Sequence, residues 1–425
     1  MNVTCFPGRL SGTIRAIPSK SDAHRKLICA ALSENGGLIP LYAPFCDDIA
    51  ATVRCLKALG AGFAETETGL QIMPVQRQAY AALDCGESGS TLRFLLPAAM
   101  CVCGKISVTG SGRLPERPIR TLTDAMTAHG VRFHGTSLPL TAEGELHGGC
   151  YEIPGNISSQ FLSGLLMALP FCDTDSEIRL TTPLQSAAYV GMTLDTLRLF
   201  GAEIAVRRDG ERFSYFIKGK QKLHFPDEIS MDGDWSNAAF WLTAGALQQG
   251  GGVSVSGLSR ASVQGDRAIL PLLCDAGAGC TGQGDTVGTF GSELRSFDVS
   301  MEEIPDLLPI LAVRAACAAE GVSHFVHAER LRLKESDRLT ATAELLRSLG
   351  GKADELPDGL SVYGGTLRGG TVDAKNDHRL VMAAAIAALK CELPVTILGA
   401  EAVNKSYPAF FTDYCALGGR IQRED

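Results

Sequence analysis

The sequence lacks the short motifs that usually mark nucleotide and zinc sites. It contains neither GxxxxGK[ST] nor a convincing GxGxxG, so nothing in it points to a bound nucleotide. No two cysteines are spaced as CxxC, and His324 and His327 lack the cysteine or acidic framework that would accompany them in a zinc site. We therefore expect a protein that works without a cofactor and without a metal.

The chain also lacks an excess of positive charge and long apolar stretches. Its 39 Lys and Arg residues are outnumbered by 47 Asp and Glu residues, and a net charge of −8 counts against a general nucleic-acid binder. The apolar runs are too short to span a bilayer, and the opening MNVTCFPGRL lacks the layout of a signal peptide. We expect a cytoplasmic protein that binds neither membrane nor nucleic acid. We interpret its 14 cysteines as reduced and mostly buried.

What the sequence does contain is a repeat of about 70 residues. Six amphipathic helical patterns each end in a glycine, the residue that most readily follows the last turn of a helix in a left-handed conformation. These stop glycines are Gly60, Gly130, Gly201, Gly277, Gly350 and Gly418. Short β-rich stretches such as GKISVTG and GGVSVSG lie between the helical patterns.

A second helical series follows the same rhythm and is apolar nearly all round, which is typical of buried helices. Its expected starts are Ser19, Ser88, Ser158, Asp234, Ile304 and Asn376. A chain of 425 residues is too long for one ordinary core. The two series together predict an α/β fold of two pseudo-symmetric lobes, each with three repeat units, helices inside and sheets outside.

Positive charges gather where these helices begin. The first turn of a helix carries unpaired N–H groups and a positive partial charge, so a cation there is unfavourable unless an anion lies nearby. Several segments nevertheless combine a helix start with cations: Lys20 and Arg25 in SKSDAHR, Arg93 in GESGSTLR, Lys334 and Arg338 in KESDR, and Lys375 and Arg379 in KNDHR. This recurrence favours a shared anionic ligand.

The segment KESDRL at 334–339 shows the pattern most densely. We expect the preceding RLRL to be a strand, which would point Arg330, Arg332 and Lys334 to one side. A helix starting near Ser336 would place Arg338 in its first turn. Glu335 lies between the cations of this segment, and its pKa depends on whether burial or the neighbouring charges dominate.

Other residues suit an anion site as well. Gly86 and Gly89 frame a turn that a ligand can approach closely, and Ser158 and Ser159 precede a buried helix. Arg117, in a loop bounded by glycine and proline, could clamp a carboxylate or phosphate. Asp306 begins an apolar helix, where it could serve either as a cap or in proton transfer. An enzyme acting on multiply anionic small molecules is indicated.

These segments resemble those of the 5-enolpyruvylshikimate-3-phosphate (EPSP) synthase family. The similarity rests on SKSxxxR, GxSGSTxR, RP at 117–118, SSQF, IPD, LKESDR, NDHR and KSYP, which occur in this order between residue 19 and about residue 411. It implies two lobes of three βαβαββ units, an inside-out α/β barrel of the enolpyruvyl transferase fold. It also implies a lobe of residues 19–231, a lobe of residues 1–18 plus 232–425 closed by the N-terminal strand, and an active site in the cleft between them.

The resemblance implies transfer of the enolpyruvyl group of phosphoenolpyruvate to the 5-hydroxyl of shikimate 3-phosphate, with release of phosphate through a tetrahedral intermediate. Asp306 would accept the proton of the attacking hydroxyl, and Glu335, assisted by Lys20, would serve proton transfer at the methylene carbon. The residues implied for shikimate 3-phosphate are Lys20, Ser21, Arg25, Ser158, Ser159, Gln160, Ser186, Tyr189, Asp306 and Lys334. Those implied for phosphoenolpyruvate are Lys20, Gly89, Arg117, Gln160, Arg338, Arg379 and Lys405.

The sequence departs from the family pattern at three places: Glu87 stands for a common asparagine, Arg330 for another, and SAAY at 186–189 lacks the usual lysine–proline. Gly89 matches the glycine of glyphosate-sensitive members, so we expect glyphosate to inhibit. A monomer is expected.

Two alternatives stay open. A UDP-N-acetylglucosamine enolpyruvyl transferase would share the fold and the donor, but that family typically carries a reactive cysteine in the loop that here spans Gly110 to Pro118 without one. A non-catalytic anion-binding protein would keep the cations but would not need Asp306 and Glu335.

Overall fold

The computed structural model describes residues 1–210, 212–249, 251–291 and 293–424. The chain divides into two compact units. The N-terminal unit comprises Lys20–Met231, and the C-terminal unit comprises Met1–Ser19 and Asp232–Asp425. Each unit has its own hydrophobic core.

The N-terminal unit contains three consecutive repeats. Each of its sheets is built from one repeat, and the strands are ordered β3-β5-β4, β6-β7-β9-β8 and β10-β11-β13-β12. The first repeat has α1 (Lys20–Leu32), β3 (Gly37–Ile39), α2 (Asp47–Ala58), β4 (Gly62–Thr66) and β5 (Gly69–Met73). The second has β6 (Ala81–Asp84), α3 (Gly89–Val102), β7 (Lys105–Thr109), η1 (Leu114–Glu116), α4 (Arg120–Thr127), β8 (Val131–His134) and β9 (Leu140–Gly144). The third has β10 (Cys150–Ile153), α5 (Ser159–Ala168), η2 (Leu169–Phe171), β11 (Ser176–Leu180), α6 (Ala187–Leu199), β12 (Ile204–Asp209) and β13 (Arg212–Ile217).

The C-terminal unit repeats the same plan, with strands ordered β15-β16-β14-β2, β17-β18-β20-β19 and β21-β22-β1-β23. Its first repeat has β2 (Gly12–Arg15), α7 (Trp235–Ala246), β14 (Gly252–Ser256), η3 (Gly265–Ala268), α8 (Ile269–Asp275), β15 (Gly279–Gln283) and β16 (Thr286–Phe290). The second has β17 (Val299–Ser300), η4 (Pro305–Leu307), α9 (Leu308–Ala316), β18 (Val322–Val326), η5 (Glu329–Leu333), α10 (Arg338–Ser348), β19 (Lys352–Leu356) and β20 (Gly359–Tyr363). The third has β21 (Gly370–Asp373), α11 (His378–Ala388), β22 (Val395–Leu398), η6 (Ala400–Lys405), α12 (Phe410–Ala416), β23 (Ile421–Glu424) and β1 (Asn2–Cys5).

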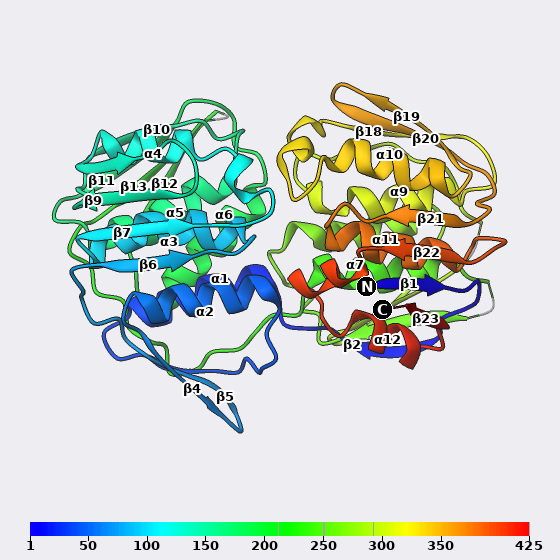
Figure 1. Cartoon of the computed structure of the whole chain (residues 1–425), viewed down its shortest axis with the longest axis horizontal. Coiled ribbons are helices and arrows are strands. Elements are labelled where there is room, and N and C mark those ends of the chain that lie inside the picture. Colours follow the sequence, from blue (N-terminus) through cyan, green and yellow to red (C-terminus); the bar gives the residue numbers. More distant parts are fainter. Residues whose placement is uncertain (211, 250, 292, 425) are drawn as a thin grey trace. The chain divides into compact units, whose positions relative to one another are not determined.

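The chain ends meet in the last of these sheets. Strand β1, from the N-terminus, lies between β22 and β23 and pairs antiparallel with both, so the first residues complete a sheet that is otherwise built from the last (Figure 1). Strand β2 similarly completes the sheet of β14 by parallel pairing.

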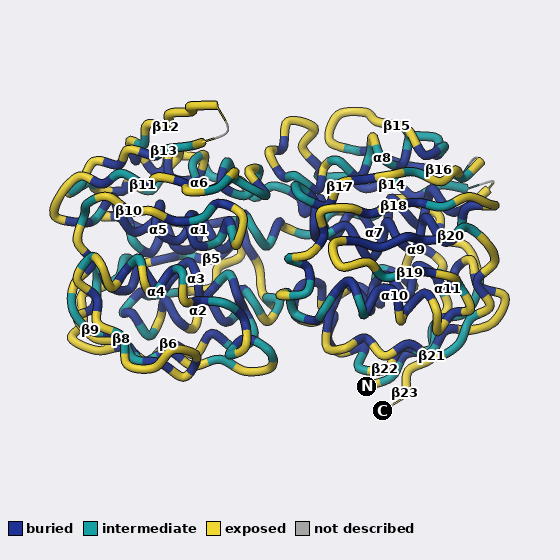
Figure 2. Tube along the Cα trace, turned by 90° about the horizontal axis from the view of Figure 1, so that it is seen from above, coloured by how far each residue is buried: buried dark blue, intermediate teal, exposed yellow. Residues whose placement is uncertain are grey.

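The second helical series is buried, as predicted. Every residue of α7 and of α11 is buried, because their apolar side chains cover the whole circumference of each helix. Figure 2 shows the buried helices inside each unit and the more exposed strands outside. The predicted fold class is therefore confirmed, although each sheet stays open and none of the described strands closes a barrel.

The predicted helix boundaries are also close to the observed ones. Ser88, Ser158 and Asp234 are N-caps whose side chains accept a backbone N–H of the following turn. All six stop glycines have positive φ, between 82° at Gly350 and 102° at Gly130. That conformation ends a helix at little cost only for glycine.

Two local expectations were wrong, one on the RLRL segment and one on the cysteines. The RLRL segment is not a strand but part of the 3-10 helix η5. The helix expected to begin near Ser336 is α10, which starts at Arg338 after the N-cap Asp337, so Arg338 lies in its first turn as predicted. The cysteines are not all reduced, because Cys274 at the end of α8 and Cys280 in β15 form a disulfide. The turn at Gly277 brings their Cα atoms to 6.0 Å, within the range that a disulfide can bridge.

No helix among the described residues is long and apolar enough to cross a membrane.

Candidate active site

Three cations of the C-terminal unit converge on Asp306. Its Oδ1 accepts a hydrogen bond from Arg338 Nη1 at 2.7 Å and lies 3.5 Å from Lys334 Nζ, and its Oδ2 accepts one from Arg379 Nη2 at 3.2 Å. Burial alone would raise the pKa of Asp306, but the charges of Arg379, Lys334 and Arg338 hold that pKa well below its usual value. Asp306 is therefore an ion-paired carboxylate and not a helix cap.

Arg338 links Asp306 to two further acids. Its Nη2 donates to Glu335 Oε2 at 2.6 Å and its Nε donates to Asp377 Oδ2 at 2.8 Å. Only 1% of Arg338 is exposed. Burial disfavours the charge of a guanidinium, yet the three carboxylates of Asp377, Glu335 and Asp306 raise the pKa of Arg338 above its usual value.

The acid–cation cluster comprises Asp306, Lys334, Glu335, Arg338, Asp377 and Arg379. Its members come from the 3-10 helix η4, the turn before α10, the first residue of α10 and the start of α11. Burial lowers the pKa of Lys334, an effect that the nearby Asp306 opposes. Lys405, at the end of η6, lies at the edge of this cluster, because its Nζ donates to the backbone oxygen of Asn376 at 2.6 Å.

In the N-terminal unit, two arginines lie over the start of α3. A Cβ atom placed on Gly89 would come within 2.6 Å of Arg93 Nη1 and 2.8 Å of Arg117 Nη1, so both guanidinium groups use the space left by the glycine. Arg93 Nη1 donates to Gln160 Oε1 at 2.9 Å, and Gln160 Nε2 donates to Ser90 Oγ at 3.0 Å. A helix N-terminus and two guanidinium groups in this arrangement suit a carboxylate or phosphate.

Arg25 holds together a second group of predicted residues. Its Nη1 donates to the backbone oxygen of Ser21 at 2.6 Å and its Nη2 to that of Tyr189 at 2.8 Å, while its Nε donates to Thr193 Oγ1. Burial lowers the pKa of Arg25 to about 10, so the guanidinium is still charged at neutral pH. The first turns of α1 and α6 are thereby fixed side by side. Ser186, the N-cap of α6, has a left-handed φ of 54°.

Three residues with direct roles in these groups had not been assigned from the sequence. Asp48 in α2 accepts a 2.7 Å hydrogen bond from Lys20 Nζ, Arg93 contacts Gln160, and Asp377 binds Arg338. Asp48 lies in the first turn of α2 and Asp377 is the N-cap of α11, positions where acidic residues are common. From the sequence, neither could be distinguished from an acid that only stabilises a helix start. Arg93 was visible only as one cation in the series.

Three cations of the sequence series lie outside the cluster. Arg332 donates to Glu355 Oε1 at 2.6 Å, and Lys375 Nζ lies 3.1 Å from Asp373 Oδ2. Arg330 donates to the backbone oxygen of Glu302. The helical turn of η5 separates Arg330 and Arg332 from Lys334, which a strand would have aligned.

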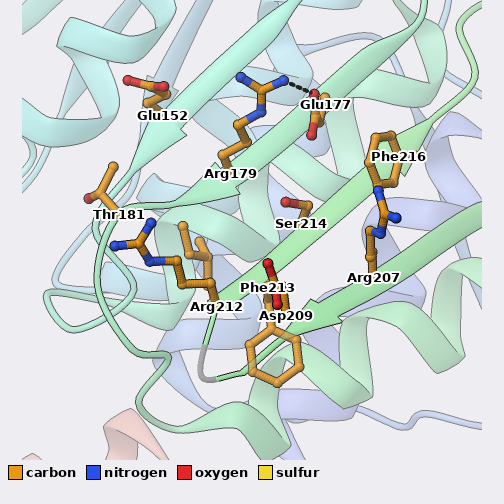
Figure 3. A pocket seen from close by; sticks show the side chains of 11 residues that line it. Glu152, Glu177, Arg179, Thr181, Arg207, Asp209, Arg212, Phe213, Ser214 and Phe216 are labelled. Atoms are coloured by element: carbon orange, nitrogen blue, oxygen red, sulfur yellow. Dashed lines mark hydrogen bonds and ion pairs between the residues drawn. The ribbon is translucent and has the colours of Figure 1, made fainter.

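A cavity of about 500 Å³ is lined by side chains of β10, β11, β12 and β13 in the N-terminal unit (Figure 3). It contains none of the residues that the sequence singled out. Arg179 in this cavity is bound to Glu177 at 2.6 Å, and three arginines face three acids around it. Because its charges balance and are well exposed, we assign no role to it.

The chain is similar along its whole length to proteins of one kind. It matches the EPSP synthase family, also described as 3-phosphoshikimate 1-carboxyvinyltransferase, over residues 6–414. Proteins named 3-phosphoshikimate 1-carboxyvinyltransferase are 40% identical in Clostridium novyi, covering 99% of this chain and 98% of the relative, and 41% identical in Clostridium acetobutylicum, covering 98% and 97%.

Solved structures show the same fold. The EPSP synthase of Acinetobacter baumannii superposes with a TM-score of 0.80 at 24% identity, covering 99% of this chain and all of that one. The enolpyruvyl transferase NikO of Streptomyces tendae superposes with a TM-score of 0.78 at 18% identity, covering 99% of this chain and 98% of that one.

Proposed function

The chain belongs to the EPSP synthase family, and on that premise we propose which of its residues perform the family's reaction. The protein transfers the enolpyruvyl group of phosphoenolpyruvate to the 5-hydroxyl of shikimate 3-phosphate and releases phosphate, in the shikimate pathway that leads to chorismate and the aromatic amino acids.

The convergence of Arg338, Arg379 and Lys334 on Asp306 carries the assignment of the donor site. Phosphoenolpyruvate has a phosphate and a carboxylate, and guanidinium groups bind both with paired hydrogen bonds. In our proposal the donor's anionic groups bind Arg338, Arg379 and Lys405 of the C-terminal unit. The N-terminal unit contributes Lys20, Gly89, Arg117 and Gln160.

Shikimate 3-phosphate is assigned to the polar groups around Arg25. These groups are Lys20, Ser21, Arg25, Ser158, Ser159, Gln160, Ser186 and Tyr189 of the N-terminal unit, with Asp306 and Lys334 of the C-terminal unit. Bringing two reactants together in a fixed orientation supplies a large part of the rate enhancement in such a reaction.

Asp306 is proposed as the base that accepts the proton of the attacking hydroxyl. In the free protein its carboxylate is held by three cations, and a carboxylate with such a low pKa is a weak base. When the donor's phosphate and carboxylate take over Arg338 and Arg379, Asp306 loses these partners and its pKa rises. Donor binding would thus prepare the base, so that proton acceptance coincides with the presence of both substrates.

Glu335, in its protonated form, is proposed to give its proton to the methylene carbon of phosphoenolpyruvate and later, as the carboxylate, to take a proton back from the methyl group, with Lys20 assisting. Addition of the hydroxyl to the protonated donor gives a tetrahedral intermediate. Its collapse breaks the carbon–oxygen bond to phosphate, and loss of a methyl proton restores the double bond. Arg338, which touches both Glu335 and Asp306, would place the two acids relative to the donor.

A phosphate-release assay tests the assignment of the reaction. We expect release only when phosphoenolpyruvate and shikimate 3-phosphate are both present, and no release when UDP-N-acetylglucosamine replaces shikimate 3-phosphate. The opposite acceptor preference would assign the chain to the related transferase, and release with neither acceptor would favour a binding protein without catalysis.

Gly89→Ala is expected to raise the KM for phosphoenolpyruvate by about tenfold and to leave the KM for shikimate 3-phosphate within about twofold. The added Cβ would displace the guanidinium groups of Arg93 and Arg117, which are the flexible ends of their side chains, so the fold should tolerate it. Steady-state kinetics with each substrate varied in turn measures both constants. Gly104→Ala, where the nearest atom to a new Cβ is 3.8 Å away, is the control. Equal changes in both constants would contradict the placement of Gly89 at the donor.

We also propose that glyphosate inhibits by occupying the donor site, since its phosphonate and carboxylate resemble the phosphate and carboxylate of the donor. Gly89→Ala should weaken this inhibition together with donor binding. The protein is further proposed to act as a monomer in the cytoplasm.

A further inference from the structure

Ser236 connects a buried acid to Arg379 within the C-terminal unit. Ser236 lies in the first turn of α7, Asp266 in the 3-10 helix η3 and Arg379 in α11. The Ser236 hydroxyl donates a hydrogen bond to Asp266 Oδ2 and accepts one from Arg379 Nη2 at 2.7 Å. All three residues are at least nine-tenths buried, and Asp266 is only 1% exposed.

A hydroxyl has one hydrogen and two lone pairs, so what it donates to determines what it can accept. Because the hydrogen of Ser236 is engaged by Asp266, its lone pairs are available to Arg379. Arg379 is held on the other side by Asp306, whose backbone oxygen accepts from Nη1 at 3.1 Å and whose Oδ2 accepts from Nη2 at 3.2 Å. The guanidinium is therefore fixed from two directions.

Capping does not explain this pair. Helix α7 is already capped by Asp234, whose carboxylate accepts the N–H of Asn237 at 2.7 Å. Burying a carboxylate is costly, and Asp266 lies close enough to Asp306 and Asp234 for their charges to raise that cost. Asp266, as a second buried acid beside the start of α7, therefore has a role other than capping the helix.

We propose that Ser236 and Asp266 are positioning residues that hold Arg379 in the orientation that binds phosphoenolpyruvate. Neither side chain contacts the donor in this proposal; Asp266 acts through Ser236, and Ser236 acts through Arg379. The inference rests on the proposed assignment of Arg379 to the donor site. Neither residue belongs to the motifs that carry the family resemblance.

The arrangement also makes donor binding sensitive to pH. Burial, and then the charge of Asp306, raise the pKa of Asp266 to about 6, with Asp234 adding to the shift and Arg379 and the Ser236 hydrogen bond opposing it. A protonated Asp266 can donate to Ser236, which frees the serine hydrogen to turn toward Arg379. Acidification through about pH 6 should then weaken the hydrogen bond between Ser236 and Arg379, because the Ser236 O–H and the Arg379 N–H, both donors, would face each other.

The test is the effect of each variant on the two KM values. At pH 7.5 we expect Ser236→Ala to raise the KM for phosphoenolpyruvate about tenfold and Asp266→Asn to raise it about threefold, with the KM for shikimate 3-phosphate unchanged within twofold. The double variant should equal Ser236→Ala alone, because Asp266 acts only through Ser236. Thr243→Val is the matched control: it lies in the same helix and is fully buried, and its hydroxyl has no hydrogen-bond partner among the described residues.

A pH series adds a readout that a purely structural role would not change. The phosphate of phosphoenolpyruvate itself titrates at about pH 6, as phosphate monoesters do, so the comparison is between wild type and Asp266→Asn. The variant should lose part of the wild-type decline in kcat/KM for the donor between pH 7 and pH 5.5. An identical decline in both proteins would overturn the proposal.

The remaining outcomes separate the inference from its premise. If Arg379→Lys leaves the KM for phosphoenolpyruvate unchanged, the donor-site assignment fails. If Arg379→Lys raises the KM for phosphoenolpyruvate but Ser236→Ala does not, only the positioning role fails. The positioning role is also overturned if the double variant raises this KM by the product of the two single effects. It is likewise overturned if the variants change both KM values equally. Should Ser236→Ala unfold below the assay temperature, Asp266→Asn decides by the same KM criterion.

Discussion

Glu335→Gln is expected to lower kcat by about a thousandfold, within the range of about a hundredfold to ten-thousandfold that a general acid or base contributes. The amide has nearly the same shape as the carboxylate and its oxygen can still accept from Arg338 Nη2, which donates to Glu335 at 2.6 Å in the native protein. The cations that bind the substrates are therefore kept, while the group that gives and takes the proton is lost.

Phosphate release measures turnover in this variant, and calorimetry measures the Kd of each substrate. A second readout is the entry of deuterium from D₂O into the methylene group of the product, which should fall with turnover because it requires protonation at that carbon. Glu344→Gln is the control, because Glu344 lies in α10 and its half-exposed carboxylate pairs with Lys375 at 3.5 Å, away from the acid–cation cluster. A loss of affinity as large as the loss of turnover would show that Glu335 is structural.

Asp306→Asn is expected to change binding and turnover in opposite directions. We expect kcat to fall by about a hundredfold or more, since the base is removed. The affinity for phosphoenolpyruvate should instead rise severalfold, because the donor no longer displaces a carboxylate from Arg338 and Arg379. In wild type this displacement opposes donor binding, and in the variant an uncharged amide replaces the competing anion.

Calorimetry of phosphoenolpyruvate binding, without the second substrate, measures this effect directly. Thermal unfolding provides a second measurement. The variant leaves Lys334 and the buried Arg338 and Arg379 with less negative charge, so it should melt lower than wild type and gain more from added phosphoenolpyruvate. Asp298→Asn is the control, because Asp298 is exposed and its carboxylate accepts the backbone N–H of His324, away from the acid–cation cluster. Weaker donor binding by Asp306→Asn would contradict the competition between Asp306 and the donor.

The sequence by itself determined the repeat and the helix boundaries. Glycines with positive φ end the amphipathic helices, and Ser88, Ser158 and Asp234 cap the buried ones. These features depend on a residue and its neighbours within one turn, so a local pattern suffices to predict them. The sequence also indicated an anionic ligand, because cations recur at places that disfavour them.

Only the tertiary structure decided which of these cations work together. Arg338 and Arg379 meet Asp306 across 32 and 73 positions of the chain, whereas Arg332 binds Glu355 instead. The same holds for Ser236, whose partners Asp266 and Arg379 come from two other elements. A local pattern gives the charge and direction of a side chain relative to its own element, and the packing of buried helices then selects its partner; that is why KESDRL indicated an anion site while the arrangement of its acids required the fold.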